Sequence, residues 1–233
     1  QTYCTLTSGA CNIAMGHSAL AKTTTGCLNV AIGQLALGAG VTTGTHNIAL
    51  GLSAMDALTT GINNIALGTD ALGAAIDVNC NVAIGKLAMS GVTNAGGAHE
   101  NVAIGIGAMV GVAATEGSRN VAIGRYAMDA LTTGCRNTAI GMDALGAVTT
   151  SDYSIGIGAC AGVGVTTQNA VINIGCAMNQ TTAGVTCIGG SCLMSACFHE
   201  TSDCRSKCNI KDLSYGLEFI NLLRPVSYKW KPQ

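Results

Sequence analysis

The sequence predicts an all-β protein, a parallel β-solenoid of about eleven coils, and three observations lead to that fold class. First, the pattern N-x-A-[ILM]-G-x-x-A-[LM] occurs eight times without a mismatch. Second, the glycines of successive copies are mostly 17 or 18 residues apart, which is too short a repeat for a pair of helices. Third, the chain is 48% hydrophobic but only 3% aromatic and 10% charged, with 32 glycines, whereas a globular enzyme usually contains more aromatic and charged residues.

Each copy of the pattern predicts one short strand and one turn. The eight copies begin at residues 12, 29, 47, 64, 81, 101, 120 and 137, and degenerate copies begin at 154, 171 and 185. The strand-like NVAIG segment is followed by turn signals such as LTTG at 58–61 and 131–134. Each repeat is therefore expected to form one coil of the solenoid.

Both faces of each predicted strand are apolar. In NVAIG the valine and isoleucine lie on one face and the alanine lies on the other, because side chains alternate along a strand. We expect the alanines to form the outer face, where small side chains let another backbone approach closely. The expected neighbour is a second copy of the chain, arranged about a symmetry axis as in a homotrimer.

Asparagine and glycine recur at fixed positions of the coil. Stacked asparagines can form a hydrogen-bonded ladder and satisfy backbone groups at the turn. The glycine is expected to adopt a backbone conformation that other residues avoid. We interpret both as structural residues, and the turn asparagines are Asn29, Asn47, Asn64, Asn81, Asn101, Asn120 and Asn137.

Charge and hydropathy exclude two classes of partner. The net charge is -1 and there is no basic run, so nothing provides the surface that neutralises nucleic-acid phosphates. No 18-residue apolar run exists, because glycine, threonine or asparagine interrupts the apolar residues every few positions. We expect no nucleic-acid binding, no membrane insertion and no signal peptide.

The twelve cysteines do not predict a metal site or a cofactor. Cys160, Cys187 and Cys192 fall within the repeats, where we expect the thiol to act as a small buried hydrophobe. The cysteines and histidine near the end of the chain contain no C-x2-C pair; they are Cys187, Cys192, Cys197, His199, Cys204 and Cys208. Glycine pairs such as those in GIGAM are not phosphate loops, because no helix and no Lys-Ser/Thr pair follow them.

Two longer repeats predict a candidate binding surface. The repeats that end at Gly105 and Gly124 have 20 and 19 residues, and inserted loops on a solenoid often bind ligands. Their polar residues His99, Glu100, Glu116 and Arg119 are candidates for contact with a host glycan or protein. The alternative is that these four residues are solvated loop residues. We find no Ser-His-Asp set and no carboxylate pair typical of a glycosidase.

The composition changes at about residue 198. Residues 198–233 contain both prolines, the only tryptophan and both phenylalanines. SYGLEFINLLRP predicts a short helix that Ser214 caps and Pro225 ends, and VSYKW predicts a strand. We therefore divide the chain into a solenoid at 1–197 and the beginning of a small α+β unit at 198–233.

The repeats resemble the head repeats of YadA-like trimeric autotransporter adhesins and similar repeats in phage tail fibres. The resemblance covers residues 12 to 193 and implies a left-handed parallel β-roll within a homotrimer.

The segment SDCRSKCNI at 202–210, together with GLEFINLLRPVSYKW, resembles the start of the intramolecular chaperone at the C-terminus of phage endosialidases and tail fibres. This resemblance implies a domain that trimerises the fibre and then cuts itself off between Thr201 and Ser202. Ser202 would be the nucleophile and Lys207 its base, because a serine hydroxyl is a weak nucleophile until a base removes its proton. Ser206 departs from the pattern, since an apolar residue is usual there.

The sequence thus supports a trimeric phage tail fibre protein, located in the virion, whose shaft contacts other fibre proteins and takes part in host attachment. The alternative is a bacterial trimeric surface adhesin. A third hypothesis makes the chain chiefly a self-cleaving Ser-Lys protease, which we favour least because such a segment acts once, on its own chain.

Overall fold

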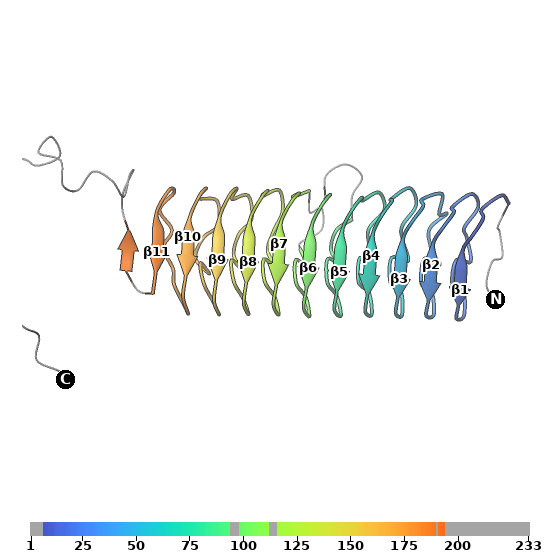
Figure 1. Ribbon diagram of the computed structural model, residues 1–233, viewed down its shortest axis with the longest axis horizontal. Helices are drawn as coiled ribbons and strands as arrows, with labels where there is room; N and C mark the ends of the chain where they lie inside the picture. The colour runs from blue at the N-terminus through green and yellow to red at the C-terminus, as the bar shows by residue number, and fades with distance from the viewer. Residues whose placement is uncertain (1–6, 94–97, 112–115, 190, 194–233) are drawn as a thin grey trace, which may run out of the picture. The chain divides into compact units, whose positions relative to one another are not determined.

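The structure is a computed structural model that describes residues 7–93, 98–111, 116–189 and 191–193. The described chain winds into a solenoid in which every coil contributes one three-residue strand (Figure 1). The strands are β1 (Ile13–Met15), β2 (Val30–Ile32), β3 (Ile48–Leu50), β4 (Ile65–Leu67), β5 (Val82–Ile84), β6 (Val102–Ile104), β7 (Val121–Ile123), β8 (Thr138–Ile140), β9 (Ile155–Ile157), β10 (Ile172–Ile174), β11 (Thr186–Ile188) and β12 (Ser191–Leu193). The described residues contain no helix, and the helix and strand predicted after residue 198 lie outside them.

The strands form one sheet in sequence order, from β1 to β12. Neighbours from β1 to β11 are parallel and pair equivalent residues of the repeat, as in Ala83 with Ala103 and Ala103 with Ala122. At the far end β12 turns back and pairs with β11 in the antiparallel direction. The predicted all-β parallel solenoid is therefore confirmed, and the repeat glycines do mark successive coils. The boundary expected at residue 197 remains a prediction, and the solenoid lies in a compact unit that spans Gln1–Met194.

The orientation of the strands differs from the sequence-based expectation. The central alanine of each strand points into the coil and is fully buried from β2 to β8, as for Ala83 and Ala122. The flanking valine and isoleucine point outward and are half-buried or exposed, as for Val121 and Ile123. The prediction that the alanines form the outer face was wrong. Inside the coil the small alanine side chains pack against a second row of core residues, most of which are large.

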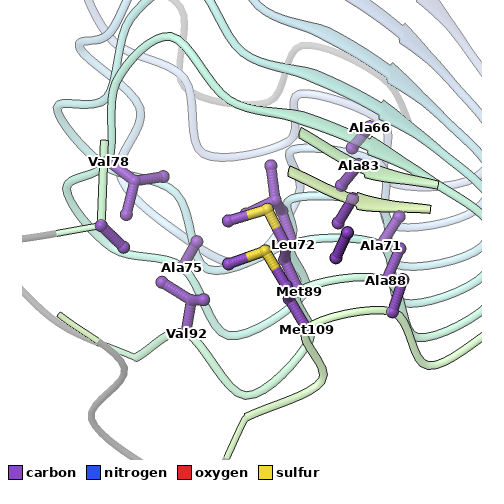
Figure 2. Packing of buried hydrophobic residues seen from close by; sticks show 14 of the residues in the cluster. Ala66, Ala71, Leu72, Ala75, Val78, Ala83, Ala88, Met89, Val92 and Met109 are labelled. Atoms are coloured by element: carbon purple, nitrogen blue, oxygen red, sulfur yellow. The ribbon is translucent and has the colours of Figure 1, made fainter. Parts of the chain in front are cut away.

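The second row of core residues comes from the last two positions of the motif. Its alanine and its leucine or methionine are both fully buried, as for Ala88 and Met89. Figure 2 shows the side chains of Leu72, Met89 and Met109 stacked in one column between the strand alanines and the valines across the coil. Each large side chain thus fills the space that the small strand residue leaves open.

The glycine that follows each strand is required for two reasons. From Gly16 to Gly175 the φ angles lie between 123° and 138°, a region that L side chains rarely adopt. A Cβ atom on Gly85 would also lie 2.5 Å from the carbonyl oxygen of Gly105 in the next coil. The predicted special conformation of this glycine is confirmed, and the close approach of adjacent coils is a further constraint.

Left-handed backbone conformations also occur at residues other than glycine. The buried leucine or methionine that ends each motif has a positive φ, for example 49° at Leu37 and 52° at Met55. The residue two positions before it and the residue before each turn asparagine behave in the same way, as at Leu87 and Arg119. Each such residue is disfavoured by about 1–3 kcal/mol in isolation, so burial and inter-coil hydrogen bonds must hold it in place.

Two cysteine predictions are corrected by the structure. Cys187 is buried but disulfide-bonded, so it is not a free thiol that packs as a hydrophobe. Cys160 is a free thiol on the αL position of its coil and is only half-buried. Within the described residues no group of three or more histidine, cysteine or acidic side chains could hold a metal ion. No helix there is long and apolar enough to span a bilayer.

Candidate functional site

The residues predicted to perform self-cleavage, Thr201, Ser202 and Lys207, lie outside the described residues. The structure does place the candidate binding residues His99, Glu100, Glu116 and Arg119. Three of the four lie at the corner of the coil that immediately precedes the strands. That corner is built on the turn asparagines.

The turn asparagines form a continuous hydrogen-bonded ladder. The side-chain oxygen of each asparagine accepts a hydrogen bond from the backbone N–H of its counterpart in the next coil, as from Asn120 to Asn101 at 2.9 Å. The side-chain nitrogen donates to a carbonyl later in its own coil, as from Asn101 to Gly117 at 2.9 Å. The ladder runs from Asn12 to Ser154, where serine takes the place of asparagine. Each rung therefore closes its own coil and aligns the next one.

The residue before each ladder asparagine points to solvent. In four successive coils these residues are Glu100, Arg119, Arg136 and Tyr153, which we call the corner row. All four have φ angles between 58° and 61°. Their backbone N–H groups donate to carbonyl oxygens in the preceding coil, as from Arg119 to His99 at 3.0 Å and from Tyr153 to Cys135 at 3.1 Å. The corner row is thus held in register by the backbone.

Glu100 and Arg119 form an exposed ion pair. Arg119 Nε donates to Glu100 Oε2 at 2.8 Å, and each side chain is about half exposed. The hydrogen bond and the charge of Arg119 lower the pKa of the Glu100 carboxyl, and Glu100 raises the pKa of the guanidinium. Because both groups are in solvent, this pair adds little to stability. Its effect is to neutralise one end of the corner row.

Arg136 and Tyr153 extend the row beyond the residues that the sequence singled out. Arg136 Nη1 donates to the phenolic oxygen of Tyr153 at 2.9 Å, and the guanidinium carbon lies 5.2 Å from the centre of the tyrosine ring. Sequence reasoning missed both residues because they lie outside the two longer repeats. The signal was their position before the turn asparagine, which they share with Glu100 and Arg119.

His99 has a structural role in the described coils. Its Nδ1 accepts a hydrogen bond from the backbone N–H of Asn79 at 3.0 Å, and its own N–H donates to Ser118 Oγ at 3.1 Å. The pattern continues with Cys135 Sγ, which accepts from Ser118, and Asp152 Oδ1, which accepts from Cys135. This second ladder uses chemically different acceptors at one position, so the sequence pattern did not indicate it.

Glu116 stands apart from the corner row. It is exposed, and its backbone N–H donates to the carbonyl of Thr132 in the next coil at 2.6 Å. Among the described residues Glu100 and Arg119 make the only ion pair, so Glu116 is not joined to them through a salt bridge. The structure thus brings together three of the four predicted binding residues.

The outward face of the sheet is a second surface of interest. Its side chains come from the first and third residues of each strand and are mostly valine, isoleucine and leucine. Several are substantially exposed, including Ile13, Met15, Ile48, Leu50, Ile123, Ile140 and Ile188. Soluble monomers rarely expose a continuous apolar patch that runs along the whole fold. This surface we call the outward sheet face.

Comparison with known proteins gives one finding, at the end of the chain. Residues 202–233 match the family model described as the chaperone of endosialidase. The match begins at Ser202 and does not extend to the solenoid. No curated protein matches the chain. No solved structure matches it either.

Proposed function

We propose that this chain forms the shaft of a homotrimeric phage tail fibre that is part of the virion and contacts other fibre proteins and the host surface. The observation that carries the proposal is the order of the two parts: a β-solenoid followed by a segment that matches the chaperone of endosialidase at 202–233. A solenoid of stacked coils supplies length and a repeated surface. The chaperone segment supplies a means to bring copies together.

The outward sheet face is the proposed subunit interface. A row of valine and isoleucine side chains on the outside of a narrow coil has no partner within the described residues of one chain. Its regular register lets an identical row from another copy pack against it over many coils. The alanine column, which the sequence suggested for this role, is inside the coil and cannot contact another chain.

Two adjacent residues test this interface because they point to opposite faces. We expect Val121→Arg to leave the solenoid folded and to weaken or abolish the trimer, because a charged group would be buried between copies. We expect Ala122→Arg to unfold its coil, because Ala122 is fully buried inside. Native mass spectrometry measures association, and circular dichroism measures folding.

A folded trimer of Val121→Arg, as stable as the unchanged chain, would show that the outward sheet face is not the interface. A monomeric unchanged chain, isolated at full length with its C-terminal segment, would refute the trimer itself. The Ala122→Arg variant is the control that separates loss of folding from loss of association.

We also propose that the C-terminal segment cleaves its own chain between Thr201 and Ser202. The hydroxyl of Ser202 would attack the carbonyl carbon of Thr201 while the amine of Lys207 accepts the hydroxyl proton. The protonated Lys207 would return this proton to the peptide nitrogen of Ser202, which becomes a free amine as its bond to the Thr201 carbonyl breaks. Water would then hydrolyse the ester between the Thr201 carbonyl and the Ser202 oxygen. The support is the family match, which begins at Ser202, and the Lys207 amine five residues later.

Intact mass under denaturing conditions tests this proposal with the full-length gene product beside Ser202→Ala and Lys207→Ala. We expect the unchanged chain to split between Thr201 and Ser202 and both variants to stay whole. An unchanged chain that stays whole would limit the segment to a trimerisation role and would favour the bacterial surface adhesin.

A further inference from the structure

The corner row presents charged and aromatic side chains along a straight line. Glu100, Arg119, Arg136 and Tyr153 precede equivalent asparagines in four successive coils, and parallel register places successive members about 4.8 Å apart. A straight row with one side chain per coil is suited to a linear polymer that lies along the solenoid. It is less suited to a compact ligand, because the side chains contact each other only within the pairs Glu100–Arg119 and Arg136–Tyr153 and do not surround a common point.

The row is prepared for binding before any ligand arrives. Its backbone is fixed by left-handed φ angles and by hydrogen bonds to the preceding coil, as from Arg136 to Ser118 at 3.0 Å. The asparagine ladder holds the following residue of each coil in place, as at Asn120 and Asn137. A ligand would therefore order only side chains and not the loop, and binding would lose less conformational entropy.

The charge of the row is unbalanced toward Arg136. Arg119 is already paired with Glu100, whereas the partner of Arg136 is the neutral phenol of Tyr153. A guanidinium has five N–H donors, and one of them satisfies the tyrosine oxygen. The remaining donors of the exposed Arg136 face solvent-accessible space, where an anion with two oxygens can bind side by side.

Tyr153 adds an aromatic surface next to this cation. Tyr153 is 56% exposed, so the part of its ring that the Arg136 guanidinium does not cover is open to a ligand. In the other described coils, the residue at the position equivalent to the corner row is never arginine or lysine. These residues are Cys11, Leu28, His46, Asn63, Cys80 and Ala170. The cationic and aromatic character is therefore local to the coils that carry the corner row.

From these observations we infer that the corner row binds a linear polysaccharide whose charges are carboxylates. The Arg136 guanidinium pairs with a carboxylate, and the ring of Tyr153 packs against the apolar face of a neighbouring sugar. Of these four residues Arg136 is then the one cation without a charged partner, whereas the phosphates of a nucleic acid require several such cations. The inference rests on the proposed role in host attachment and names the class of surface molecule recognised.

The test is isothermal titration calorimetry of the full-length chain with an oligogalacturonate at low ionic strength. The matched controls are its methyl ester, which lacks the carboxylates, and a single-stranded oligonucleotide of the same length. We expect the oligogalacturonate to bind, the ester to bind at least about tenfold more weakly, and added salt to weaken binding. Arg136→Gln and Tyr153→Ala should each weaken binding about tenfold.

The control variant is Lys22→Gln, which removes an equivalent exposed charge far along the solenoid and should leave binding unchanged. The inference would be overturned if the unchanged chain did not bind the oligogalacturonate, or if Arg136→Gln bound it as tightly as the unchanged chain does. It would also be overturned if the oligonucleotide bound more tightly than the oligogalacturonate. Native mass spectrometry of the same samples shows whether the trimer is present, and so distinguishes failure of the polysaccharide site from failure of the proposed fibre function. A trimer that does not bind refutes only the polysaccharide site, and a trimer lost in Arg136→Gln assigns the row to the subunit contact instead.

Discussion

Individual residues in this solenoid are selected by backbone conformation as much as by packing. The glycine after each strand from β1 to β9 has a positive φ, and a Cβ atom there would collide with a backbone carbonyl of the next coil. Leucine and methionine accept a left-handed conformation at the end of the motif, because their side chains are then directed into the core. A repeated sequence thus carries repeated local strain, which the stacked coils offset.

Two half-buried aspartates make the stability of the solenoid depend on pH. Burial raises the pKa of the Asp56 and Asp129 carboxyls, and each has a second aspartate nearby in the next coil, Asp70 and Asp143 respectively. A carboxyl whose pKa is higher in the folded chain than in the unfolded chain binds its proton more tightly when folded. Stability therefore falls as the pH rises through this range.

Asp129→Asn tests this pH dependence. We expect the variant to have a modestly higher Tm than the unchanged chain at neutral pH, because the half-buried charge is removed. The gain should vanish near about pH 3, where the aspartate is protonated. Asp152→Asn is the control, since the Asp152 side chain accepts a hydrogen bond from the Cys135 N–H and asparagine keeps that acceptor. An equal gain at both pH values would contradict the assignment.

Each structural element of the coil is too small to be stable alone. The strands have three residues, and the turn asparagine links each one to the coil before and after it. Asn120 accepts from the N–H of Asn137 at 2.9 Å and donates to the carbonyl of Gly134 at 2.9 Å. A strand and its corner are therefore stabilised as a unit by side-chain hydrogen bonds.

Asn120→Leu is expected to lower the free energy of unfolding by several kcal/mol, because a buried N–H and a buried carbonyl each lose a partner at about 1–3 kcal/mol. Asn120→Ser should be less harmful, because Ser154 fills the same position in the ninth coil and accepts from Val171. Chemical denaturation of both variants measures the difference. If both variants lost the same free energy of unfolding, the side-chain hydrogen bonds of the ladder would not be what stabilises the coil.

On the largest scale, the described coils form a one-dimensional stack. Every strand from β2 to β11 pairs only with its two neighbours in sequence, and equivalent residues face each other in all parallel pairs. Such an architecture tolerates changes in the number of coils, provided that the register of the remaining coils is kept.

Deletion of residues 120–136 removes one whole coil and tests this property. We expect the shortened chain to fold, with β6 pairing with β8 and Asn101 meeting Asn137 in the ladder. Deletion of residues 120–128 leaves half a coil and should prevent folding around it. Circular dichroism and native mass spectrometry compare the two. A misfolded whole-coil deletion would contradict the stack.

The repeat pattern determined much of this protein by itself. Its period set the coil length, its strand-like pentapeptides located every strand from β1 to β11, and its recurrent asparagine and glycine indicated the corners. These features follow from local chemistry: alternation along a strand, side-chain amide hydrogen bonds and the conformational freedom of glycine. The family match at residues 202–233 likewise agrees with the motif that begins at Ser202.

Only the tertiary structure decided which strand face is inside. Both faces are apolar, so alternation alone could not choose between Ala122 and its neighbours Val121 and Ile123. The choice depends on the width of the coil, which the buried methionines and leucines across it determine. The corner row also depends on the tertiary structure. Glu100, Arg119, Arg136 and Tyr153 are far apart in sequence and become neighbours only when the coils stack in register.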